Sequence, residues 1–220
     1  MSNQENQLVP ITQELRSMMK NTENRVEVFI PEKTLATLKK QGYSLCFAKK
    51  VGDYEYNVVW KFLDNYLQNN VFSWQPIYQI FGTNEFKENV KVSVSTNNVD
   101  IGLGETTTLN SAGNLMNPIT EGPETSINVI NEYRWIHFGI SQLSKNADGE
   151  MESTPIYVSK NKMEKGTASF TPVEKVAVWF QSNAYTSTMF VQMETNHIEL
   201  DLTGNESAKG KYENGKWSKI

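Results

Sequence analysis

The feature that most constrains the fold is a run of short apolar and aromatic segments that begins at Tyr43 and continues to the end of the chain. Gly, Asn, Asp and Pro separate these segments, and no stretch with helical periodicity stands between them. The segments are "YSLCFAKKV", "YEYNVVWKFL", "FSWQPIYQIF", "VKVSVST", "SINVINEYRWIHFGI", "TPIYVSK", "VEKVAVWFQ", "STMFVQM" and "HIELDLT". The sequence therefore predicts a mainly β protein, an antiparallel β-sandwich or barrel-like fold of about nine strands.

Helical patterns are confined to the N-terminal part of the chain. "PITQELRSMMK" places its apolar residues on one stripe, and "PEKTLATLKKQG" has Pro31 where a helix begins and Gly42 where a helix ends. The segment "RVEVFI" between them reads as a strand. We expect a small helical and strand piece over residues 1–42, packed on a β-sandwich domain over residues 43–220, with a single continuous domain favoured.

The charge and the cysteine content exclude several classes of protein. The net charge is −4, and only three of the basic residues are arginine, so no nucleic-acid partner is expected. Cys46 is the single cysteine, which excludes an intrachain disulfide and a thiolate zinc cage. No apolar run resembles a signal peptide or a spanning helix. We therefore expect a soluble protein that is cytoplasmic or released without a classical signal peptide.

Groups that could carry catalysis are scarce, and the best candidate is a metal site. On a strand, His197, Glu199 and Asp201 would point to one face, and His137 could add a second imidazole from another strand. A divalent metal is therefore a possible cofactor. The alternative is that these polar residues form the solvent face of a strand whose opposite parity is apolar.

Aromatic residues offer a second kind of site. Half of the chain's aromatic residues lie between Tyr43 and Phe86. Tyr and Trp combine an apolar ring with a polar group and often occupy ligand pockets and membrane interfaces, although a thick core could also absorb them. The predicted ligand-binding residues are Trp74, Tyr78, Trp60, Tyr56 and Trp135. Pro76 cannot donate a ladder hydrogen bond, so a bend or bulge is expected at Gln75–Pro76, with Trp74 nearer an edge.

Two segments around a long Gly-, Thr- and Asn-rich stretch suggest a membrane role. "NVKVSVSTNN" and "ETSINVINEY" alternate aliphatic with polar residues, a pattern that resembles the insertion hairpins of β-pore-forming toxins. An ordinary pair of solvent-faced strands explains the pattern equally well. The sequence favours a non-enzymatic, toxin-like or other binding protein that recognises a glycan or a lipid or membrane surface. The alternatives are a metal-dependent β-sandwich enzyme and a self-assembling structural β protein.

Overall fold

The computed structural model describes residues 23–146 and 148–220 and is mainly β, with three separate sheets and no closed barrel. The seven-stranded sheet has the order β14 (Lys216–Lys219), β13 (Ser207–Glu213), β1 (Asn24–Phe29), β4 (Asn69–Thr83), β8 (His137–Lys145) and β9 (Met151–Val158), and β5 (Val99–Ile101) pairs with β4 off this path. The four-stranded sheet has the order β12 (Ile198–Asp201), β11 (Pro172–Gln181), β2 (Ser44–Val51) and β3 (Lys61–Leu63). The three-stranded sheet has the order β10 (Gly166–Phe170), β7 (Ile127–Asn131) and β6 (Thr106–Leu109).

The prediction of a mainly β fold is confirmed, but the prediction of about nine antiparallel strands is wrong. The described residues form fourteen strands, and two of the pairings, β1 with β13 and β6 with β7, are parallel. The additional strands are mostly short, such as the three residues of β5 and the four of β6. β5 and β6 lie in the Gly-, Thr- and Asn-rich part of the chain, where low hydrophobicity hides the strand pattern.

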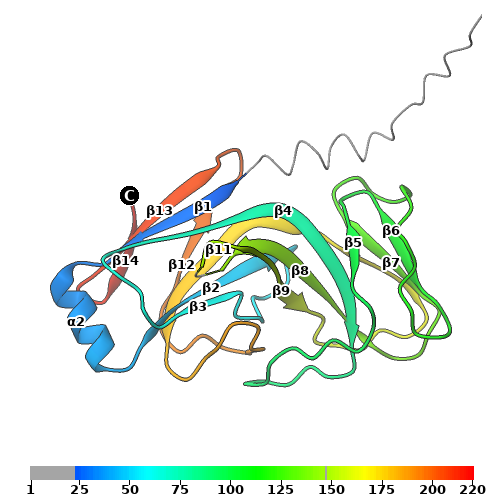
Figure 1. The fold of residues 1–220 in the computed structure, drawn as a ribbon, viewed down its shortest axis with the longest axis horizontal. Helices are drawn as coiled ribbons and strands as arrows, with labels where there is room; N and C mark the ends of the chain where they lie inside the picture. The colour runs from blue at the N-terminus through cyan, green and yellow to red at the C-terminus, as the bar shows by residue number, and fades with distance from the viewer. Residues whose placement is uncertain (1–22, 147) are drawn as a thin grey trace, which may run out of the picture.

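The main core lies where the seven-stranded and four-stranded sheets meet. Side chains of β1 and β4, such as Val26 and Trp74, belong to the same buried cluster as Phe47 of β2 and Val178 of β11. Figure 1 shows β4 as a long curved strand that passes over β11 and β2. Two sheets that bury their inner faces against each other account for the sandwich-like arrangement.

The expected irregularity in β4 is confirmed. The register between β4 and β8 shifts between Trp74 and Tyr78, on either side of Pro76, while β4 remains one strand of 15 residues. The side chain of Gln142 donates to the backbone carbonyl of Gln75 at 3.0 Å and so satisfies an acceptor beside the shift. Trp74 is not near an edge, however, because β4 lies between β1 and β8.

The N-terminal strand is an inner member of the largest sheet. β1 lies between β13 and β4, so the described part of residues 1–42 shares its sheet with strands from the rest of the chain. The predicted second helix is present as α2 (Glu32–Lys40), which begins after Pro31 and is followed by Gly42 at a φ of +75°. The first predicted helix, in "PITQELRSMMK", lies outside the described residues.

Two of the alternating segments have different outcomes. "HIELDL" forms β12, with Ile198 and Leu200 buried as expected. "VKVSVST" does not form a strand: it makes one isolated bridge, from Lys91 to Thr188, and Val94 is exposed. In the other half of the suggested toxin-like hairpin, β7 pairs with β6 and β10, so the two segments do not form a hairpin with each other.

Candidate functional site

The structure buries three of the five predicted ligand-binding aromatic residues. Trp60 and Trp74 are 0% exposed and Tyr78 is 3% exposed, so the expectation of a surface contact through these side chains is wrong. Trp74 and Tyr78, four residues apart on β4, both belong to the main buried cluster. Trp135 is 57% exposed, as a contact residue would be, but it lines none of the pockets described below.

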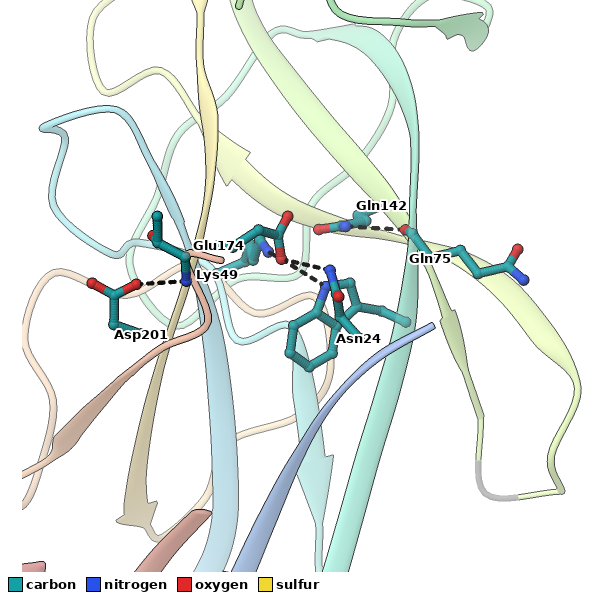
Figure 2. A network of polar contacts seen from close by, with 8 residues as sticks. Asn24, Lys49, Gln75, Gln142, Glu174 and Asp201 are labelled. Carbon is teal, nitrogen blue, oxygen red and sulfur yellow. Dashed lines mark hydrogen bonds and ion pairs between the residues drawn. The ribbon is translucent and has the colours of Figure 1, made fainter. Parts of the chain in front are cut away.

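The buried aromatic rings surround an ion pair. Lys49, on β2, has a fully buried side chain, and its Nζ lies 2.6 Å from Oε2 of Glu174 on β11. The same oxygen accepts hydrogen bonds from Nδ2 of Asn24 at 2.9 Å and from Nε1 of Trp74 at 3.2 Å (Figure 2). The Lys49 ammonium also lies 4.9 Å from the Trp74 ring centroid, within the range of a cation–π contact.

This cluster, which we call the Glu174 network, joins the two large sheets. Burial lowers the pKa of Lys49, and the adjacent Glu174 opposes that effect. Burial also raises the pKa of Tyr78, with a smaller contribution from Glu174. Since Asn24 and Trp74 come from the seven-stranded sheet, and Lys49 and Glu174 from the four-stranded sheet, we interpret the network as structural.

The predicted metal ligands on β12 have other partners. Glu199 accepts a hydrogen bond from the Tyr56 hydroxyl at 2.8 Å, and Nζ of Lys175 lies 3.5 Å from a carboxylate oxygen of both Glu199 and Asp201. His197 is exposed and makes an edge contact with the Tyr56 ring, 6.5 Å between centroids. The carboxylates thus interact with a lysine and a tyrosine on the solvent face of the strand. Tyr56, the fifth predicted aromatic residue, is half-buried.

His137 does not complete that group. It lies in β8, buried, with Nδ1 2.7 Å from the carbonyl oxygen of Ser159. Within residues 23–146 and 148–220, no three His, Cys, Asp or Glu side chains are arranged to hold a metal ion. The predicted metal site therefore has no geometric support in the described part of the chain.

A pocket of about 640 Å³ opens beside the turn that follows β2, and we call it the Tyr54 pocket. The Tyr54 ring, 49% exposed, stacks on the buried Tyr157 ring at a centroid distance of 5.2 Å and an interplanar angle of 23°. The pocket is lined by Asp53, Tyr54, Glu55, Asn57, Phe138, Tyr157, Ser159, Lys160, Asn161, Lys162, Met163, Thr167, Ala168 and Phe170. It therefore combines an aromatic wall with amide, hydroxyl and charged groups.

Local backbone contacts hold Tyr54 at the pocket. Gly52 has a φ of +51°, which favours glycine, and its N–H donates to the carbonyl of Thr171 at 2.6 Å. The buried Asn57 side chain donates to the carbonyl of Val158 at 2.6 Å and accepts from the N–H of the same residue at 3.3 Å. The turn is thus attached at both ends, to the segment before β11 and to β9.

The charges around the pocket balance. Asp53, Glu55, Lys160 and Lys162 all line the pocket, and Nζ of Lys160 lies 2.5 Å from Oε2 of Glu55. A pocket with two acidic and two basic side chains offers hydrogen-bond donors and acceptors without a net charge. That arrangement suits a neutral, polar ligand with an apolar face.

Sequence reasoning missed Tyr54 as a site residue. The available signal was local: "GDYE" places an aromatic residue between two carboxylates, directly after a glycine in a turn. Tyr54 lies in a turn, so the alternation that directs every second strand residue into the core does not apply to it. Functional side chains are commonly carried by such connecting segments.

Comparisons of the chain with protein-family models, with curated proteins and with solved structures give no match. The structure adds that, in the part of the chain it describes, no helix is both long enough and apolar enough to span a membrane.

Proposed function

We propose that this protein is a non-enzymatic binding protein that recognises a neutral glycan at the Tyr54 pocket. The observation that carries the proposal is the half-exposed Tyr54 ring, which stacks on the buried Tyr157 ring and lines a pocket of about 640 Å³. The C–H face of a sugar ring can pack on such an aromatic wall. Apolar pockets with a few convergent polar groups are typical ligand sites.

The polar lining supports a polyhydroxylated ligand. Asn161 and Thr167 can donate and accept hydrogen bonds, and Asp53 can accept from sugar hydroxyls. The balanced charges favour a neutral sugar over an anionic one. A non-enzymatic role agrees with the burial of Cys46, which raises the pKa of its thiol and withdraws the one cysteine from solvent.

Self-assembly through the sheet edges has less support. The edge strand β9 contains Pro155, which cannot donate to an added strand. The other edge strand of the seven-stranded sheet, β14, carries Lys216 and Lys219, and charged side chains on an edge oppose strand addition. Both features are common protections against edge-to-edge pairing.

The experiment is a glycan array with the purified protein, followed by calorimetric titration of the glycans that bind. Tyr54→Ala removes the aromatic wall and should weaken binding of each positive glycan at least tenfold. Tyr54→Trp, which keeps a flat ring, should retain binding.

Tyr185→Ala is the matched control. Tyr185 is 60% exposed and packs on Phe62 rather than in the Tyr54 pocket, so its removal should leave glycan affinity unchanged. The absence of binding to any neutral glycan would overturn the proposal, as would equal affinities of the wild type and Tyr54→Ala.

A further inference from the structure

A second pocket, of about 480 Å³, lies at the opposite end of the β8–β9 hairpin from the Tyr54 pocket, and we call it the Lys61 pocket. It is lined by Glu23, Arg25, Lys61, Leu63, Val71, Phe72, Ser73, Lys145, Asn146 and Gly149. Three of these residues are basic and one is acidic. The lining thus differs from the balanced lining of the Tyr54 pocket.

The pocket exists because β4 loses a neighbour. β4 pairs with β1 from Asn69 to Trp74, but its register with β8 ends at Trp74 opposite Ser144. The preceding residues of β4 therefore have a strand on one side only. β3, from the four-stranded sheet, borders the space that remains, together with Asn146 and Gly149.

Lys61 is the unusual residue in this pocket. The residue is 7% exposed and lines the pocket, and among the described residues no carboxylate lies within ion-pair distance of its ammonium. Lys61 is opposite Phe47 in the β2–β3 register, so its side chain leaves β3 on the face that packs against the core. The stem of Lys61 is therefore largely buried while its ammonium is reached only through the pocket, and lysines this little exposed are usually paired.

Two carboxylates that lie beyond ion-pair distance partly offset the effect of burial on Lys61. Asp148 and Glu152 act on it through space without an ion pair, and burial, the larger effect, lowers the pKa of Lys61. The other charges of the pocket are engaged at its rim. Nζ of Lys145 lies 2.6 Å from Oε1 of Glu23, and Nε of Arg25 lies 3.4 Å from a carboxylate oxygen of Glu27.

From this geometry we infer that the Lys61 pocket binds a phosphate or sulfate group, with Lys61 as its principal cation. The ligand group would supply the counter-charge that Lys61 lacks. Arg25 adds donors in a fork that matches an oxyanion, and the side-chain amide of Asn146 adds a neutral hydrogen-bond donor. The group can be a free oxyanion or the phosphate of a lipid headgroup, because both present the same chemistry.

The first test uses inorganic phosphate and sulfate as probes with the full chain. At constant ionic strength set with chloride, millimolar phosphate or sulfate should raise the Tm of the wild type. Lys61→Met keeps the length of the side chain and removes the charge. This variant should fold with an equal or higher Tm without anion, and its apparent affinity for phosphate should fall at least tenfold.

A second arm separates the two sources of the group. Vesicles of phosphatidylcholine with phosphatidic acid test the headgroup source, and pure phosphatidylcholine vesicles are the blank. If the wild type co-sediments with the phosphatidic acid vesicles and Lys61→Met does not, the inference is supported and the phosphate group belongs to a lipid. A Tm response to free phosphate alone supports it with a soluble source.

Two further variants keep the inference falsifiable. Lys33→Met, on an exposed face of α2, should respond to anions like the wild type, whereas Arg25→Gln should weaken the response. No response of the wild type in either arm would overturn the inference. A response that Lys61→Met retains in full would also overturn it.

Discussion

The ammonium of Lys49 and the carboxylate of Glu174 lie 2.6 Å apart, with the lysine side chain fully enclosed and the carboxylate shared by donors from both large sheets. Breaking a buried pair by removing one partner leaves an uncompensated charge, whereas a pair of neutral residues leaves none. The Glu174 network should therefore be sensitive to single changes and more tolerant of a paired change.

The first prediction tests this asymmetry. Glu174→Gln should lower the free energy of unfolding by about 3 kcal/mol, because it leaves the Lys49 ammonium buried without a counter-charge. The double variant Lys49→Met with Glu174→Gln should recover part of that loss. Denaturant unfolding of the wild type, both single variants and the double variant gives the coupling energy.

The partly exposed pair of Lys211 and Glu213, whose Nζ and Oε2 lie 2.7 Å apart, supplies the control. Lys211→Met should leave stability almost unchanged. Additive losses at Lys49 and Glu174, with no recovery in the double variant, would contradict the interpretation of the pair as one coupled unit.

The second prediction concerns the contact between β8 and β4. A Cβ at Gly139 would lie 2.2 Å from the Phe81 ring, and Phe81 is fully buried and cannot move aside. Gly139→Ala should therefore destabilise the protein by about 3 kcal/mol through overpacking. Gly210→Ala is the matched strand control, because its Cβ would meet Leu200 at an ordinary 3.6 Å. Equal midpoints of thermal unfolding for the two variants would contradict the predicted clash between the added Cβ and Phe81.

The third prediction is a loss of stability in alkali. Burial raises the pKa of Tyr66 to about 12 and raises the pKa of Tyr78 and Tyr157 as well. Unfolded tyrosines ionise near a pKa of about 10, so the unfolded chain loses protons that the folded chain keeps. These residues contribute full stability below pH about 10, and that contribution falls as the pH rises above it.

Lys49 acts in the opposite direction. Its pKa is lower in the folded chain than in the unfolded chain, so its contribution to stability increases as the pH rises toward the pKa of an unfolded lysine. Lys61, whose pKa burial also lowers, acts in the same direction as Lys49. Since more tyrosines have a raised pKa than lysines have a lowered one, we expect a net loss of stability. Denaturant unfolding at pH values between about 8 and 11 measures it, with the tyrosinate absorbance of the folded protein as a parallel readout. A constant free energy of unfolding across that range would refute the prediction.

The fourth prediction concerns mild acid. Burial lowers the pKa of His137, and the hydrogen bond to Ser159 opposes this only in part. The unfolded chain then binds a proton before the folded chain does, so stability is complete above pH about 6.5 and falls as the pH drops below it. His137→Gln should remove this component. Parallel stability curves of the wild type and the variant between pH about 5 and 7 would exclude His137 as its source.

The sequence predicted the secondary structure best where burial alone determines it. In "HIELDL" the apolar residues pack on the core and the polar ones face away, so the segment with the alternating pattern is also the strand β12. "VKVSVST" has the same alternation, but Val90 and Val92 cover a buried cluster from a segment that lacks a partner strand. Alternation shows that a segment has two different faces, and it does not show that a neighbouring strand is present.

The candidate site was harder to predict because its determinants are distant in sequence. The indole N–H of Trp74 can be buried because Glu174, a hundred residues away, accepts its hydrogen bond. Local sequence suggested that this polar group would need solvent. The position of Tyr54 depends on Asn57 and Gly52, which attach its turn to β9 and to the segment before β11, both much later in the chain.

The parallel pairing of β1 with β13 has a consequence for synthesis. Arg25 pairs with Ser207, so the first described strand acquires one of its two neighbours only after all the strands from β4 to β12 have been made. Contacts between such distant residues slow folding, because a long loop must close first. During translation β1 would therefore present an unpaired edge, and a chain that ends before β13 would keep that edge exposed to other strands.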